Sequence, residues 1–121
     1  MTSLVACLST GKGTWGHVLR LINDGNWDSI ILITNEFGKE NLKPEKDADK
    51  IELVVINPNL PIDNLVQEIT TVLKEKIKDT EIALNVVSGS GKEHMALLSA
   101  VMKSGLGFRL VALTRDGIKE V

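Results

Sequence analysis

The sequence predicts an α/β fold, a Rossmann-like three-layer sandwich built on a mainly parallel sheet of five or six strands. Five short, β-prone apolar runs alternate with segments of helical periodicity. Near-continuous apolar character is typical of strands that are buried on both faces of a parallel sheet. Their alternation with helices indicates βαβ units, right-handed crossovers and helices on both faces. The 121 residues are expected to form one domain, 1–121.

The expected strands follow one another along the chain at 3–8, 30–34, 52–56, 81–87 and 108–113. Segments with apolar side chains along one helical face lie between them, at 14–24, 62–78 and 93–105. Gly105 is expected to cap the last helix. The polar stretch 36–50, which contains Pro44, is expected to hold a short helix at most and then a mobile loop. The Asp116-Gly117 pair predicts a turn into a short sixth strand.

The composition argues against several classes of protein. The chain is 43% hydrophobic and 25% charged, as is usual for a globular domain. Its net charge of −2 gives no general attraction to duplex nucleic acid or to an anionic membrane, so neither partner is expected. Cys7 is the only cysteine and lies in an apolar run, which favours a buried thiol. Without a signal pattern or an apolar run of about 18 residues, a cytoplasmic location is expected.

Two glycine-rich loops share one layout, S-T-G-K-G-T-W-G at 9–16 and N-V-V-S-G-S-G-K at 85–92. Each follows an expected strand and precedes an expected helix, so both lie at the carboxyl edge of the sheet, where ligands bind in open α/β folds. Glycines let backbone N–H groups approach a phosphate, and a helix N-terminus adds partial positive charge. The loops predict a nucleotide or phosphodiester site lined by Ser9, Thr10, Lys12, Ser88, Ser90 and Lys92.

Two common nucleotide signatures fit these loops poorly. The first loop matches G-x-G-x-x-G, but Glu36 is late and Asp28 early for the acid that binds the ribose. The chain also leaves no room for a substrate domain, which disfavours a nicotinamide enzyme. The second loop departs from the phosphate-binding P-loop, because Val86 and Glu93 occupy the places of its first Gly and its final Ser or Thr. Two ordinary tight turns with solvated lysines are the simpler alternative.

The stretch N-V-V-S-G-S-G-K-E-H-M resembles the CRISPR-associated Rossmann-fold (CARF) domains, whose fourth strand ends in a signature of the type Asn/Asp-x-Thr-Gly-Gly-Thr-Lys-x-Met. The residues that carry the resemblance are Asn85, Ser88, Gly89, Ser90, Gly91, Lys92 and Met95. Ser88 stands where Thr is usual, and Ser90-Gly91 replaces Gly-Thr before the lysine. Ser9 and Thr10 fit the other ligand loop of the family.

The resemblance implies a homodimer that binds a cyclic oligoadenylate second messenger across its two-fold axis, in CRISPR antiviral signalling. Cyclic tetra-adenylate is the first choice of ligand, and no metal or other cofactor is expected. The chain would be a sensor or a ring nuclease, in which the substrate's own 2′-OH attacks the adjacent phosphorus. The catalytic candidates are Lys92, Ser9 and Thr10. The candidates for ligand contact are Gly11, Lys12, Gly13, Asn35, Ser88, Gly89, Ser90, Gly91 and His94.

The sequence is also compatible with other interpretations. It could be a non-catalytic interaction module or another nucleotide-binding Rossmann protein. His17 lies where a general base could act, but a partly solvated histidine near a helix start is the simpler interpretation. Trp15 could stack on adenine, although its position favours the core. The two histidines lack companion carboxylates at ligand spacing, which disfavours a zinc site.

Overall fold

The computed structural model of the chain describes residues 2–9, 12–42 and 48–121. Its centre is one six-stranded sheet in the order β3-β2-β1-β4-β5-β6. Every neighbouring pair is parallel except β5 and β6, which form an antiparallel hairpin. The strands are β1 (Ser3–Leu8), β2 (Ser29–Thr34), β3 (Ile51–Val55), β4 (Glu81–Asn85), β5 (Gly107–Thr114) and β6 (Gly117–Glu120). The predicted α/β fold with a mainly parallel sheet is confirmed.

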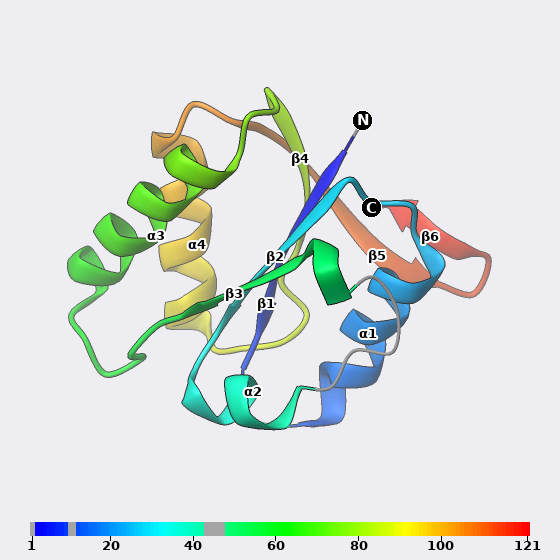
Figure 1. Cartoon of the computed structure of the whole chain (residues 1–121), viewed down its shortest axis with the longest axis horizontal. Coiled ribbons are helices and arrows are strands. Elements are labelled where there is room, and N and C mark those ends of the chain that lie inside the picture. Colours follow the sequence, from blue (N-terminus) through cyan, green and yellow to red (C-terminus); the bar gives the residue numbers. More distant parts are fainter. Residues whose placement is uncertain (1, 10–11, 43–47) are drawn as a thin grey trace.

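Helices cover both faces of the sheet (Figure 1). They are α1 (Trp15–Asp24), α2 (Glu36–Asn41), α3 (Ile62–Lys76) and α4 (Gly91–Lys103), with short 3-10 turns at Lys12–Thr14 and Ala48–Lys50. One apolar cluster joins α3 and α4 to alternate side chains of β1, β2 and β4, and a second cluster joins α1 to the other face. The parallel strands are therefore buried on both sides, as their continuous apolar runs require. None of the described helices has the length and apolar character to cross a membrane.

Element boundaries differ from the expected ones where side chains bond to the backbone. β4 ends at Asn85, two residues before the predicted end at residue 87. The Asn85 side chain accepts a hydrogen bond from the N–H of Val87 (3.2 Å), and this bond turns the chain. α4 begins at Gly91, two residues before the predicted start at residue 93, because Ser90 caps it. The short helix in 36–50 is confirmed as α2, whereas the loop expected after it, at 43–47, lies outside the described residues.

Glycines with positive φ end α4 and form the final hairpin, as the sequence predicts. Gly105 (φ +73°) follows the cap residue Ser104, and its N–H bonds to the carbonyl of Met102 (3.2 Å). The N–H of Leu106 reaches the carbonyl of Val101 (3.4 Å), which completes a Schellman motif. Gly117 (φ +102°) closes the turn between β5 and β6.

The order of the strands fixes where a ligand site lies. From β1 the chain crosses to β2 on one side, whereas β4 lies on the other side of β1 and leads to β5. The connections therefore diverge between β1 and β4, which makes this point the topological switch point of the sheet. Both glycine-rich loops leave the carboxyl ends of these two strands.

Candidate functional site

Hydrogen bonds join the β1 loop directly to the β4 loop. The N–H of Ser9 donates to Oγ of Ser88 (3.1 Å), and Oγ of Ser9 donates to Oε1 of Glu93 (3.0 Å). Ser9 and Ser88 are both buried. The structure thus brings together the two loops that the sequence placed at one edge. Thr10 and Gly11 lie outside the described residues, and of Lys12 only the backbone is described.

The N-terminus of α4 is capped by a reciprocal pair of hydrogen bonds. Oγ of Ser90 accepts from the N–H of Glu93 (3.2 Å), and Oε1 of Glu93 accepts from the N–H of Ser90 (2.9 Å). Gly91 and Lys92 occupy the first two helical positions, where an α-helix offers no internal acceptor to the N–H groups. These two amides and the helix dipole favour an anion at this end of α4.

Glu93 is the central residue of the site, and it was not among the residues predicted to act there. Its side chain is 4% exposed, and Oε1 receives two hydrogen bonds, from Ser9 and Ser90. Oε2 is buried without a hydrogen-bond partner among the described residues. The sequence holds one signal for the capping role, because Ser90-x-x-Glu93 is the pattern of a capping box.

Gly89 occupies a position that no other residue can take without strain. Its φ of +110° lies in the region that favours glycine. A Cβ at this position would lie 2.6 Å from Sγ of Cys7 and 3.2 Å from Nε2 of His94. That histidine nitrogen bonds to the carbonyl of Ser88 (2.8 Å), so the imidazole holds the loop from the α4 side. Gly89 therefore shapes the loop and lets it pack on β1.

Cys7 is a buried thiol beneath this loop, in agreement with the prediction from its apolar run. Burial raises the pKa of the thiol to about 12, and the nearby charge of Glu93 acts in the same direction. The folded state therefore holds the thiol proton more tightly than the unfolded chain does. The resulting contribution to stability is fully present below the ordinary thiol pKa and is lost as the pH rises toward 12.

We expect Cys7 to resist thiol reagents at pH values near 8 in the native protein and to react quickly in denaturant, because the thiolate is the reactive form. A colorimetric thiol assay with and without urea measures both rates. Rapid labelling of the native protein at the rate of a free cysteine would contradict the burial of Cys7.

Lys92 and Asn35 make local contacts in the structure. Nζ of Lys92 donates to the carbonyl of Pro58 (3.0 Å) in the loop before α3, and the side chain is exposed. Oδ1 of Asn35 accepts from the N–H of Gly38 (2.9 Å) and so caps α2. Both residues lie at the carboxyl edge of the sheet, but the structure does not bring their side chains into the bonded group around Ser9 and Glu93. Gly13 is exposed in the turn before α1.

Trp15 belongs to the core, as its position favours. Its side chain is 7% exposed, and Nε1 donates to the carbonyl of Ser9 (2.7 Å). The indole also packs against Phe37 of α2, with ring centroids 5.7 Å apart. Trp15 therefore joins the β1 loop to the core through its hydrogen bond to Ser9.

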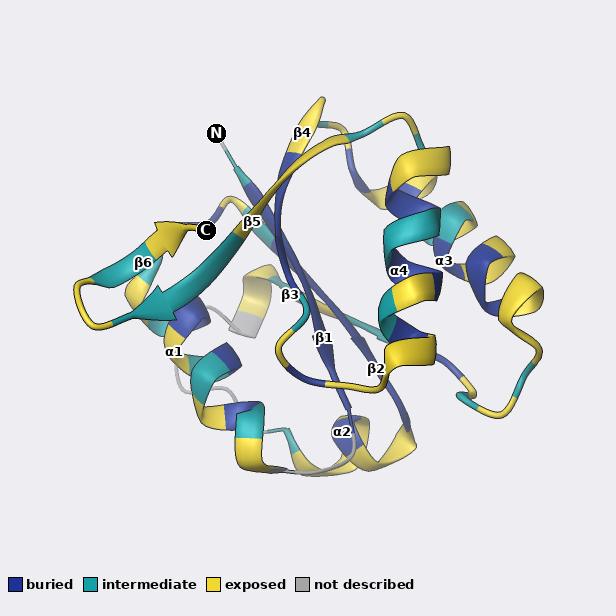
Figure 2. Cartoon of the chain, turned by 180° about the vertical axis from the view of Figure 1, so that it is seen from behind, coloured by how far each residue is buried: buried dark blue, intermediate teal, exposed yellow. Residues whose placement is uncertain are grey.

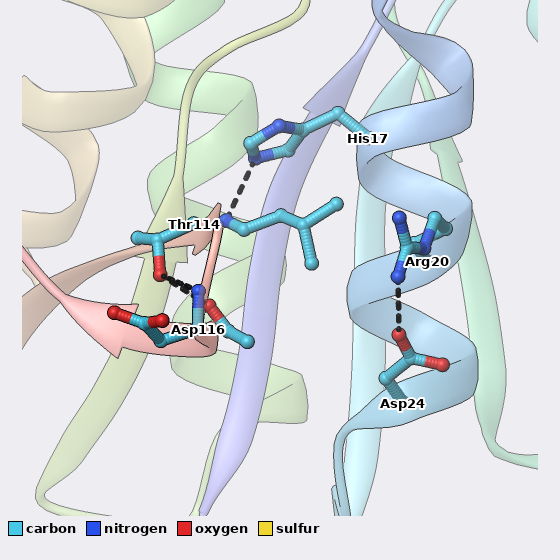
Figure 3. A network of polar contacts seen from close by, with 7 residues as sticks. His17, Arg20, Asp24, Thr114 and Asp116 are labelled. Atoms are coloured by element: carbon cyan, nitrogen blue, oxygen red, sulfur yellow. Dashed lines mark hydrogen bonds and ion pairs between the residues drawn. The ribbon is translucent and has the colours of Figure 1, made fainter.

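His17 joins α1 to β4 and β5. Its Nε2 accepts from the backbone N–H of Leu113 (3.2 Å) and lies 3.3 Å from Nδ2 of Asn85. Asn85 also donates to the carbonyl of Val111 (2.8 Å). Figure 3 shows the imidazole pointing from α1 toward β5, near Thr114. Because Nε2 accepts a hydrogen bond from the backbone of β5, the His17 side chain links α1 to that strand.

Replacing His17 with Leu should lower the free energy of unfolding by about 1–3 kcal/mol, because the N–H of Leu113 loses its acceptor. Urea unfolding measures the change. Arg20→Ala is the matched control on the same helix: its ion pair with Asp24 (3.4 Å) is largely exposed and should contribute less than about 0.5 kcal/mol (Figure 3). Equal effects of the two substitutions would contradict the role of His17.

Comparison with known proteins identifies no family for the chain. No protein-family model matches the chain, and no curated protein matches it. Among the described residues, no group of three or more His, Cys, Asp or Glu side chains is placed to hold a metal ion. The site consists of two loops, the start of α4 and a buried carboxylate that ties them together.

Proposed function

We propose that the chain binds a cyclic oligoadenylate at the carboxyl edge of β1 and β4, as a CARF-type domain of CRISPR antiviral signalling. The observation that carries this proposal is the direct bonding of the two glycine-rich loops at the switch point, through Ser9, Ser88 and Glu93. Small side chains and backbone amides at this point suit a phosphodiester ligand. The resemblance of the run from Asn85 to Met95 to the CARF signature favours cyclic oligoadenylate among such ligands.

Each group of the site has a role in this proposal. The amides of Gly91 and Lys92 meet a phosphodiester at the start of α4. The ammonium of Lys92 leaves the carbonyl of Pro58 and neutralises the phosphate, a change that its exposed side chain permits. The hydroxyl of Ser9 donates a hydrogen bond to Glu93. Oγ of Ser9 therefore still has a lone pair that can accept a hydrogen bond from a ribose hydroxyl.

The ring would be shared by two copies of the chain. A cyclic ligand with repeated phosphates matches a two-fold site in which every loop occurs twice. Cleavage, as a second activity of the same site, requires no metal: the ribose 2′-OH attacks the adjacent phosphorus and loses its proton. The bond from phosphorus to the 5′ oxygen breaks, that oxygen takes up a proton, and a 2′,3′-cyclic phosphate remains. Lys92 would stabilise the charge on the phosphoryl oxygens.

The test is incubation of the protein with labelled cyclic tetra-adenylate or cyclic hexa-adenylate in EDTA. Binding is scored by gel shift and cleavage by chromatography. We expect Lys92→Ala to weaken binding about tenfold or more, since a charge-assisted hydrogen bond is lost. Lys103→Ala, at the other end of α4, is the control and should bind like the unaltered protein. Metal-free cutting that Lys92→Ala loses would identify a ring nuclease, and tight binding without cutting a sensor. Failure of both rings to bind would overturn the proposal.

A further inference from the structure

The β4 loop, residues 86–90, has few buried side chains to hold it in place. Its residues are mostly exposed, whereas β4 itself is mostly buried (Figure 2). A loop with few buried contacts keeps its form mainly through hydrogen bonds. The two histidines of the chain take part in these bonds, His94 directly and His17 through Asn85.

The partners of the two histidines require opposite tautomers. Nε2 of His94 lies 2.8 Å from the carbonyl oxygen of Ser88. A carbonyl oxygen only accepts, so this nitrogen carries a proton and donates the hydrogen bond. Nε2 of His17 lies 3.2 Å from the backbone N–H of Leu113, which only donates, so this nitrogen carries no proton. The proton of neutral His17 is therefore on Nδ1.

Asn85 links His17 to the β4 loop. The Asn85 side chain is 2% exposed; its Nδ2 donates to the carbonyl of Val111 (2.8 Å), and its Oδ1 accepts from the N–H of Val87 (3.2 Å). These two backbone partners fix the direction of the amide, because a reversed amide would place N–H against N–H and oxygen against oxygen. Nδ2 therefore also donates to Nε2 of His17 (3.3 Å), which accepts from Asn85 as well as from Leu113.

Protonation of His17 is incompatible with these bonds. A proton on Nε2 would face two donors, the N–H of Leu113 and the amide of Asn85, and neither accepts it. Asn85 offers an acceptor only if its amide reverses, which brings Oδ1 to His17 and takes it from the N–H of Val87. His94 responds differently, because a protonated imidazole still donates to its carbonyl partner. Acid therefore disturbs the β4 loop through His17 and preserves the bond of His94.

The charged groups near His17 do not pair with its imidazole. The charged side chains of α1, β4, β5 and the β5–β6 hairpin pair with one another or are exposed, namely Arg20 with Asp24 (3.4 Å), Arg109 with Glu81 (2.8 Å) and Glu120 (4.0 Å), Asp116 with Lys119 (3.5 Å), and the exposed Arg115. β1 adds apolar side chains on this side of the sheet. The side chain of Lys12 lies outside the described residues. Within the described part of the chain, the two donors to Nε2 therefore decide how His17 responds to acid.

We infer that His17 and Asn85 are positioning residues that make the β4 loop sensitive to acid. While His17 is neutral, Asn85 bonds to the N–H of Val87 and holds the loop in the described form. Protonation of His17 removes that acceptor and frees the backbone just before Ser88, whose Oγ accepts from the N–H of the β1 loop (3.1 Å). The link between the two loops weakens as a result. For the ring, the inference rests on the proposed function and predicts weaker binding once His17 is charged.

Nuclear magnetic resonance of the ligand-free, isotope-labelled protein tests the inference. The nitrogen shifts of the imidazoles identify the tautomers, and a pH titration gives the range in which each histidine gains its proton. We expect Nδ1–H in neutral His17 and Nε2–H in neutral His94. As His17 becomes charged, the protection of the Val87 and Leu113 amides against hydrogen exchange should fall about tenfold, which corresponds to one hydrogen bond. An Nε2–H tautomer of neutral His17, or unchanged protection while His17 titrates, would overturn the inference.

Two matched glutamine variants separate the histidines. His17→Gln offers an oxygen to the N–H of Leu113 but does not titrate, so the loop should keep its protection across the whole pH range. In His94→Gln the amide still donates to the carbonyl of Ser88, so the fall in protection caused by acid should remain. The amide of Val5, in the fully buried part of β1, is the reference and should keep its protection. Equal pH dependence in His17→Gln and the unaltered protein, or a parallel fall at Val5, would overturn the inference.

Ring binding tests the consequence for the proposed site. The affinity for cyclic tetra-adenylate, measured by gel shift, should fall about tenfold as His17 gains its proton. In His17→Gln it should stay constant or rise, because general electrostatics favours an anion as the protein gains positive charge. An acid-sensitive loop in a protein that binds no ring would leave the inference standing and overturn the proposed function. Ring binding of equal affinity with neutral and charged His17 would leave the proposed function standing and overturn the positioning role.

Discussion

Replacing Gly89 with alanine is expected to lower the free energy of unfolding by about 3 kcal/mol. The backbone at φ +110° costs a residue with a Cβ roughly 1–2 kcal/mol. The new methyl group would also lie 2.6 Å from Sγ of the fully buried Cys7, and such overpacking costs about 1–3 kcal/mol. Urea unfolding of Gly89→Ala measures the sum.

Two glycines of the same chain separate these two terms. Gly117 has φ +102° and no atom within 4 Å of an added Cβ, so Gly117→Ala should show the backbone cost alone. Gly91 has neither a positive φ nor a close neighbour, and Gly91→Ala should be neutral or stabilise α4 by up to about 1 kcal/mol. Cys7→Ala added to Gly89→Ala should recover part of the loss. An unchanged stability of Gly89→Ala would show that the loop does not pack on Cys7.

Replacing Glu93 with alanine is expected to cost about 2 kcal/mol of stability and to weaken ring binding. The hydroxyl of Ser9 and the N–H of Ser90 lose their shared acceptor, and each buried donor left without a partner costs about 1–3 kcal/mol. Removal of the unpaired Oε2 offsets part of this loss, because a buried carboxylate oxygen without a partner is itself unfavourable. Urea unfolding and the gel shift measure the two effects.

The control variants for Glu93 distinguish its hydrogen bonds from its charge. Glu93→Gln keeps an oxygen that accepts from both donors, so it should retain most of the stability. Glu68→Ala, at an exposed position of α3, should change stability by less than about 0.5 kcal/mol. Ser9→Ala and Glu93→Ala should be non-additive, because they remove the same bond. Additive effects of these two substitutions would mean that the β1 and β4 loops are not coupled through this pair.

The strands and the two loops could be predicted from the sequence because their signals are local. Runs such as S-L-V-A-C-L and the glycines after them carry their information within a few residues. The role of Glu93 could be predicted only as a helix cap. Its contact with Ser9 joins residues 84 positions apart, and a glutamate at that helical position could equally point to solvent. Burial of its carboxylate depends on the packing of β1 beside β4.

The exposure of β5 and the contacts of Asn35 and Lys92 also depend on the folded arrangement rather than on local sequence signals. The run F-R-L-V-A-L has the pattern of a strand buried on both faces, yet Phe108 and Leu110 are exposed. After β5 the chain turns back at Gly117 instead of adding a helix over this face. Oδ1 of Asn35 lies at the predicted edge but accepts from the N–H of Gly38, and Nζ of Lys92 donates to the carbonyl of Pro58, because polar side chains bond to nearby backbone groups.

The stoichiometry of ring binding tests the central claim most directly. Calorimetric titration of the protein with cyclic tetra-adenylate, in EDTA and at low temperature, counts the chains that share one ring. We predict saturation at one ring for every two chains, with binding weakened by Lys92→Ala. Saturation at one ring per chain, or no heat of binding with either the tetra-adenylate or the hexa-adenylate ring, would contradict a cradle shared by two copies.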